Sequence, residues 1–474
     1  MLKKFLSFSI GTWIGAIIGI VTIPLITHFF SPDDLGKAAM FALALNVMMV
    51  ISMFGIDQTF VRFYYEEKTH VLLSKCLIIT FLFTCIIFII FYFLRVKISI
   101  YLFNAYVPEM MILLCIATII SIINSYAVQT IRMDQKGLLY SSIQVAVRLF
   151  ELLFIVVLFY FLRSNYQVMI YAKAIALFAV TVYAMYATRS VWAKIHIKPY
   201  ESVYSFKDIF VYSYPLAFTM FITWAFQSFD KIALKQWSSV SELGIYTAAF
   251  RIVLILQIVQ TSFTAYWVPL SYEKFLKNND DIANRYFFSK ANSLISAIML
   301  LAGVGLIMTK ELVTYIMGPE YKAAVAMIPC LVLVPVLYTI SESTVIGIGF
   351  HKKVKVVFLI SILTLISNII GNYILVPAYN GVGAAIAAGI SAIVFFVLRT
   401  HFSLKYYKVD YNLIKFYFLL AMVFAYALIS TFLPWKPYNL VTGFLLILLI
   451  SGIYHVSLFE LVLRVKIFRK PGTE

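Results

Sequence analysis

Three basic residues, Arg148, Lys173 and Arg251, lie within long apolar segments of the sequence. A cation at the centre of a lipid-facing helix costs about 2.5–3.5 kcal/mol even on the lenient insertion scale. Such residues therefore need a partner inside protein or water, and an anion such as a phosphate suits them best. We expect these three residues to bind an anionic head group at mid-membrane depth.

Polar residues share one face of the segment that carries Arg148. Ser141, Gln144, Arg148 and Glu151 recur at intervals that place them on one side of a helix. We expect Ser141 and Gln144 to line a polar cavity. The simpler interpretation is a structural ion pair between Arg148 and Glu151, but it leaves Lys173 and Arg251 unexplained, because their own segments carry no neighbouring acid.

Acidic residues inside or at the edges of the apolar segments are a second group of candidates. They are Asp57, Glu151, Asp230 and Glu342. Intramembrane acids often serve proton or sodium coupling, and we assign them that role as a hypothesis. For Asp57 and Asp230 the alternative is a residue at the membrane interface.

The composition places these residues in a membrane protein. Of 474 residues, 63% are hydrophobic and 12% are charged, whereas soluble domains carry roughly 25% charged residues. The net charge of +17 is spread over short loops, so it indicates membrane orientation and no nucleic-acid partner. The four cysteines lack metal-ligand spacing, and we expect no metal, no cofactor and no catalytic residues.

A spanning helix needs about 20 mostly apolar residues. That criterion predicts an all-α integral membrane protein with about 14 transmembrane helices, the N- and C-termini being cytoplasmic. The predicted spans are 5–30, 37–57, 71–94, 110–131, 138–162, 166–188, 209–229, 243–265, 287–309, 323–347, 355–376, 382–399, 413–433 and 438–462. With this topology 26 basic residues fall in cytoplasmic segments and nine outside, as the positive-inside rule requires.

The spans fall into two groups of six and a final pair. Ser31–Gly36 and Ser239–Gly244 share an acid before Leu-Gly at the start of the second helix of each group, which indicates a parallel internal repeat. We therefore expect an N-terminal six-helix lobe (1–188), a cytoplasmic linker (189–208), a C-terminal six-helix lobe (209–401), and a helix pair with a basic tail (402–474).

Several segments resemble the polysaccharide-biosynthesis flippases, the Wzx-type O-antigen and capsule repeat-unit transporters of the multidrug/oligosaccharidyl-lipid/polysaccharide exporter superfamily. The segments that carry the resemblance are 23–36, 54–58, 62–64, 242–246 and 381–385. The resemblance extends through span count and order over nearly the whole chain. It implies two six-helix lobes in a V around a central cavity, with an accessory helix pair at the C-terminal end.

The resemblance also implies a function. Such a protein flips an undecaprenyl-diphosphate-linked oligosaccharide from the inner to the outer leaflet of the bacterial cytoplasmic (inner) membrane by alternating access. An ion gradient or the membrane potential would drive it, and it would not be an enzyme. Expected partners are the lipid-linked glycan, membrane lipids, and polysaccharide polymerase and chain-length machinery.

The alternatives are a lipid II flippase, a drug/cation antiporter of the same superfamily, and a membrane polysaccharide polymerase or ligase. A drug antiporter would place acids in its cavity, whereas the least ambiguous deep charges here are basic. A polymerase or ligase needs external catalytic residues, and no outside loop exceeds about fifteen residues.

Overall fold

The computed structural model describes the chain except for residues 1, 163–164, 196–202, 278–280, 434–436 and 460–474. The described part is helical and consists of two compact units, Met1–Lys231 and Ile232–Glu474. Several basic residues used to orient the chain lie outside the described residues, namely Arg163, Lys198, Lys436, Arg464, Lys466, Arg469 and Lys470. The cytoplasmic placement of the termini and the expected lobe boundaries stay predictions.

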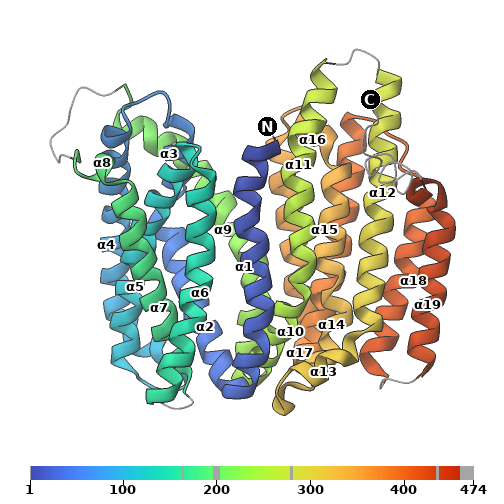
Figure 1. Ribbon diagram of the computed structural model, residues 1–474, viewed down its shortest axis with the longest axis horizontal. Helices are drawn as coiled ribbons and strands as arrows, with labels where there is room; N and C mark the ends of the chain where they lie inside the picture. The colour runs from blue at the N-terminus through green and yellow to red at the C-terminus, as the bar shows by residue number, and fades with distance from the viewer. Residues whose placement is uncertain (1, 163–164, 196–202, 278–280, 434–436, 460–474) are drawn as a thin grey trace, which may run out of the picture. The chain divides into compact units, whose positions relative to one another are not determined.

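The first unit is built from long apolar helices joined by short turns (Figure 1). Its helices are α1 (Leu2–Phe29), α2 (Pro32–Met53), α3 (Ile56–Phe63), α4 (Thr69–Phe103), α5 (Pro108–Met133), α6 (Gly137–Leu162), α7 (Tyr166–Ala187), α8 (Arg189–Trp192) and most of α9 (Phe206–Trp237). Helix α6 packs between α1 and α7, and α5 packs against α7.

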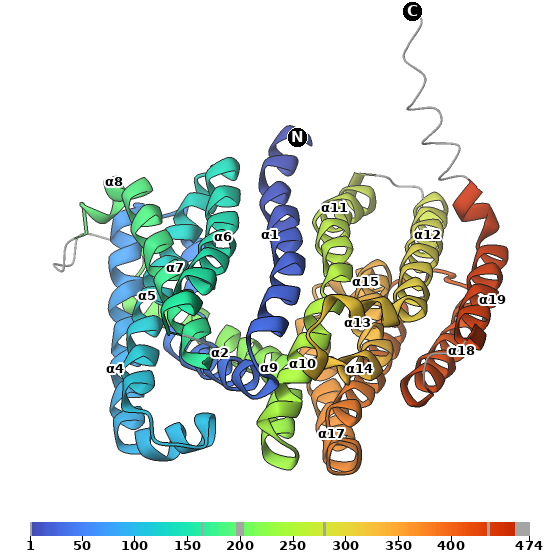
Figure 2. The ribbon, with the colours of Figure 1, turned by 60° about the horizontal axis from the view of Figure 1, so that its bottom comes forward.

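The second unit contains both long helices and short broken ones. They are α10 (Val240–Val253), α11 (Ile255–Lys277), α12 (Asp281–Met308), η1 (Lys310–Leu312), α13 (Val313–Ile316), η2 (Pro319–Tyr321), α14 (Ala324–Leu331), α15 (Leu333–Thr344), α16 (Ile346–Phe350), α17 (Val354–Tyr406), α18 (Leu413–Phe432) and α19 (Pro437–Ile453). Figure 2 shows α18 and α19 side by side, next to α12.

The predicted all-α membrane architecture is confirmed. Ten helices among the described residues are long and apolar enough to cross a membrane, or eleven when α10 and α11 count as one bent span. Each of the fourteen predicted ranges falls largely on described helices. The ranges 355–376 and 382–399 share α17, which is interrupted at Asn380 (φ 49°, ψ −129°). The range 243–265 is not one straight span, because α10 and α11 meet at 49°.

The repeated sequence signature forms the same structure twice. The backbone N–H of Asp34 donates to the Ser31 hydroxyl at 3.2 Å, and that of Glu242 donates to the Ser239 hydroxyl at 3.1 Å. Each serine thereby caps the helix that follows it, α2 in the first unit and α10 in the second.

The two acids of this signature also make equivalent long-range contacts. Asp34 accepts a hydrogen bond from the backbone N–H of Tyr166 at 2.9 Å, at the start of α7. Glu242 accepts one from the backbone N–H of Gly381 at 3.0 Å, just after the interruption of α17. In each unit the acid thus joins the second predicted span to the sixth, which supports the internal repeat.

A close approach of α1 and α6 organises one side of the first unit. A side chain at Gly11 would place its Cβ 2.6 Å from Ser141 Cα, whereas one at Gly19 would meet nothing within 4 Å. The Gly11 N–H donates to the Ser141 hydroxyl at 3.2 Å. Gly11 is therefore a helix-packing position, as small residues of membrane helices often are.

Gly11→Leu is expected to force α1 away from α6 and to destabilise the protein by about 1–3 kcal/mol, as overpacking does. Gly19→Leu is the matched control on the same helix and should leave stability unchanged. Thermal unfolding in detergent micelles measures both. Equal unfolding temperatures for the two variants would contradict the packing assigned to Gly11.

Candidate functional site

Arg148 lies in the middle of α6 with most of its side chain exposed. It stands eleven residues from Gly137 and fourteen from Leu162, about 16 and 21 Å along the helix axis. Its side chain is 60% exposed, and its Nη1 is 3.7 Å from Glu151 Oε2. The ion pair that the sequence suggested therefore forms, but it leaves much of the guanidinium free to meet another group.

The polar face of α6 has a buried end and an exposed end. Ser141 is buried against α1, and Gln144 is exposed. Further along, Arg148 is exposed and Glu151 is half-buried. An exposed arginine at this depth cannot be left against hydrocarbon at low cost, so this surface has to face water or a polar ligand.

The other two predicted cations lie in different surroundings. Lys173 is half-buried in α7, which packs along α6 in the same unit. Arg251 is half-buried in the last turn of α10, in the second unit. A cation in a last turn interacts favourably with the helix dipole. Arg251 also stands three residues before the bend at Leu254, where α10 gives way to α11.

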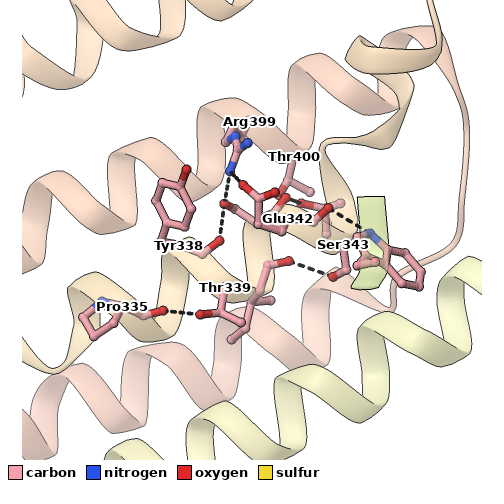
Figure 3. A network of polar contacts seen from close by, with 11 residues as sticks. Pro335, Tyr338, Thr339, Glu342, Ser343, Arg399 and Thr400 are labelled. Atoms are coloured by element: carbon pink, nitrogen blue, oxygen red, sulfur yellow. Dashed lines mark hydrogen bonds and ion pairs between the residues drawn. The ribbon is translucent and has the colours of Figure 1, made fainter. Parts of the chain in front are cut away.

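Glu342 is held in a buried ion pair in the second unit (Figure 3). Arg399 Nη1 lies 2.8 Å from Glu342 Oε1 and donates to the Ser341 hydroxyl at 2.6 Å. The guanidinium also stacks 5.3 Å from the ring centre of Tyr338 and 4.9 Å from that of Phe395. Glu342 thus joins α15 to α17 by a charge-assisted contact.

Hydroxyl and amide groups surround this pair. Ser343 donates to Asn292 Oδ1 at 2.8 Å, and the hydroxyls of Thr344 and Thr400 lie 2.8 Å apart. Trp267 Nε1 donates to the Glu342 carbonyl at 3.1 Å. The network connects α11, α12, α15 and α17, so it fixes how these four helices pack.

Two further basic residues make contacts in the interior that the sequence does not predict. The positive-inside count places Arg399 with the cytoplasmic loops, because it ends a predicted span, but α17 continues to Tyr406 and the Arg399 side chain is only 16% exposed. Lys310 was counted with an outside loop, yet it is 2% exposed and donates to the Ser430 carbonyl. One feature of the sequence indicates the contact of Arg399: Glu342 is an acid within a predicted span and therefore needs a partner.

The remaining acidic candidates are both buried. Asp230 lies in α9, one residue before the end of the first unit. Asp57 lies in the first turn of α3, where its Oδ2 accepts a hydrogen bond from Gln58 Nε2 at 2.8 Å. Both are therefore enclosed by protein, and their depth in the membrane stays a prediction.

Comparison with known proteins identifies the family and the fold. The sequence model of the family described as "polysaccharide biosynthesis protein" matches residues 1–274. A search of curated proteins found no match. The resemblance expected from the sequence is thereby confirmed at the level of the family.

Solved transporter structures share the fold. The lipid II flippase MurJ in an inward closed conformation aligns with a TM-score of 0.70 at 18% identity, covering 95% of this chain and 99% of that one. An outward-facing multidrug resistance MATE family transporter of the MOP superfamily aligns with a TM-score of 0.55 at 15% identity, covering 85% and 94%. A MATE structure in a bent conformation gives 0.51 at 18% identity, covering 85% and 95%.

Glu342→Gln is expected to lower the free energy of unfolding by about 3–5 kcal/mol, because it leaves Arg399 buried without a counter-charge. The double variant Glu342→Met with Arg399→Met removes both charges and should recover most of that loss.

Denaturant or thermal unfolding in detergent tests this expectation. The control is Arg285→Met, which breaks the exposed pair with Asp281 (2.7 Å) and should cost less than about 1 kcal/mol. A Glu342→Gln protein as stable as the wild type would show that the pair is not a structural contact.

Proposed function

The chain belongs to the polysaccharide biosynthesis protein family, and we propose that it flips an undecaprenyl-diphosphate-linked oligosaccharide across a membrane. It is a multi-pass membrane protein with the fold of MOP superfamily transporters. The cargo of our proposal is an O-antigen, capsule or exopolysaccharide repeat unit. It moves from the inner to the outer leaflet of the bacterial cytoplasmic membrane by alternating access.

The exposed guanidinium of Arg148 is the observation that supports this proposal most directly. A sugar head group carries many polar groups, and each would cost several kcal/mol if left unpaired in hydrocarbon. A cation in the middle of a helix can donate charge-assisted hydrogen bonds to a diphosphate, while the polyprenyl tail stays in lipid. We assign Arg148, Lys173 and Arg251 to the diphosphate, and Ser141 and Gln144 to the polar surface beside it.

The membrane potential can drive the outward step. Moving one charge through 100 mV is worth about 2.3 kcal/mol, and with the inside negative an anionic head group is driven outward. An acidic residue that carries a proton or another cation inward would add to this driving force. The same inward step would return the carrier to its inward-facing state. Glu342 is the weakest of the four acidic candidates for that role, because Arg399 already neutralises it.

A lipid II flippase is the second candidate. The alignment with MurJ covers nearly the whole chain, and the name of that protein states its cargo. Both cargos are lipid-linked sugars, so the same cations would serve either of them. Two complementation experiments distinguish the candidates. Our proposal predicts that the chain restores surface polysaccharide in a strain that lacks its repeat-unit flippase and does not rescue a lipid II flippase mutant.

A polymerase or ligase would need catalytic residues in its loops. Cysteine-accessibility mapping and alanine scanning of those loops should find none whose loss abolishes polysaccharide. We also propose that the polymerase and the chain-length machinery act downstream, on the flipped product.

Single Ala substitutions of Arg148, Lys173 and Arg251 are each expected to reduce surface polysaccharide in a flippase-deficient strain. Loss of a charged hydrogen bond costs about 1.5–3 kcal/mol, which corresponds to about 10- to 100-fold in affinity. Lys322→Ala, at an exposed position, is the matched control and should export normally. Normal export from all three variants at equal protein levels would contradict the assignment of the cations.

A further inference from the structure

The chain is interrupted between α2 and α3, inside the first unit. Phe54 (φ 44°) and Gly55 (φ 72°) both adopt left-handed backbone conformations there. A Cβ at Gly55 would lie 2.7 Å from the Ser213 carbonyl oxygen, so only glycine fits this position. Interrupted helices leave carbonyl groups without intrahelical partners, and membrane proteins tolerate such breaks where they are buried or line a polar site.

Asp57 stands directly after this interruption, and its carboxylate is only half satisfied. The residue is 7% exposed, and Oδ2 accepts from Gln58 Nε2 at 2.8 Å. Its other oxygen, Oδ1, accepts no hydrogen bond from any residue that the structure describes. Buried polar atoms nearly always have a partner, so an orphaned carboxylate oxygen calls for an explanation.

A second amide side chain lies beside Asp57. Gln129 of α5 lies close enough to interact with the same carboxyl group. Its Nε2 donates to the Ser125 hydroxyl at 3.2 Å, and its Oε1 accepts nothing from the described residues.

The charged groups nearby are engaged elsewhere. Lys75 of α4 donates to the Tyr204 carbonyl at 2.6 Å, and Arg62 of α3 pairs with Glu66. The titratable groups that face Asp57 are Cys76 of α4 and Tyr126 of α5, both fully buried. Within the described residues, Asp57 therefore has no cationic partner to hold it as a carboxylate.

We propose that Asp57 is a proton-binding site, which takes one proton from water onto Oδ1 during the transport cycle and returns it to water. The bound proton makes Oδ1 a hydrogen-bond donor, whereas the charged carboxylate can only accept. The start of α3 supplies the opposing influence, because a helix N-terminus favours the charged form. Opposing influences of this kind suit a group that must both bind and release a proton. The proposal rests on the transport function proposed above and names its coupling residue.

The first test follows thermal unfolding of the purified protein from about pH 5 to about pH 8. A proton bound more tightly in the folded state stabilises it at low pH, and this contribution is lost as the pH rises. We expect the wild-type unfolding temperature to fall by about 5 °C or more over this range. Asp57→Asn carries its own donor and should lose most of that dependence, whereas Glu320→Gln, at an exposed site, should retain it.

The same measurement separates a proton from a metal cation. Replacing about 100 mM choline chloride with sodium chloride should not change the unfolding temperature, since a site that holds a proton needs no sodium. A sodium-dependent stabilisation that Asp57→Asn abolishes would overturn the proposal in favour of a sodium site. A wild-type pH dependence that Asp57→Asn retains in full would overturn it as well.

The second test measures surface polysaccharide in the flippase-deficient strain. Asp57→Asn, locked in the neutral form, should lower export severalfold at equal protein level and with an unfolding temperature near that of the wild type at low pH. Normal export by Asp57→Asn would overturn the coupling role. If the wild-type chain itself restores no polysaccharide, the proposed cargo is wrong, and the unfolding measurements still decide whether Asp57 binds a proton.

Discussion

A charge inside a membrane must meet an opposite charge, water or a ligand, and this constraint organises the structure. The chain satisfies it in three different ways. Glu342 and Arg399 neutralise one another at 2.8 Å and are sheltered by aromatic rings. Arg148 keeps most of its side chain exposed in the middle of α6. Asp57 is buried with one oxygen unsatisfied. The first solution holds helices together, and we propose that the second meets an anionic cargo and that the third exchanges a proton.

The two units also share one structural device, which the sequence shows only faintly. In each of them a serine caps a helix, and an acid three residues later accepts a backbone N–H from the start of a distant helix. In the first unit the Asp34 carboxylate also accepts a hydrogen bond from the backbone N–H of Ser31 at 3.4 Å, so it serves the helix end and the tertiary contact together. The contact joins the second and sixth spans in both units. The short sequence motif alone does not reveal this shared tertiary contact.

Much of the architecture could be predicted from the sequence, because a bilayer demands long apolar segments. The fourteen ranges, the helix starts at Ser31 and Ser239, and the shared face of Ser141, Arg148 and Glu151 all follow from local patterns. The interruption at Asn380 falls in the gap between the predicted ranges 355–376 and 382–399, but the bend after Val253 did not follow from the sequence, since it occurs within an apolar run of ordinary composition. The contact of Arg399 with Glu342 did not follow either, because the two residues are distant in the sequence and a basic residue near the end of an apolar run can be either interfacial or enclosed by protein.

The ion pair of Glu342 and Arg399 constrains how this protein can evolve. Losing either member alone leaves a buried charge uncompensated, so the path to a different pair passes through an unstable intermediate. Relatives should therefore keep both residues or lack both, and positions 342 and 399 should covary. Such covariation would indicate the contact between α15 and α17 in an alignment of the family. It would identify this packing of the second unit even among relatives whose overall sequence identity is low.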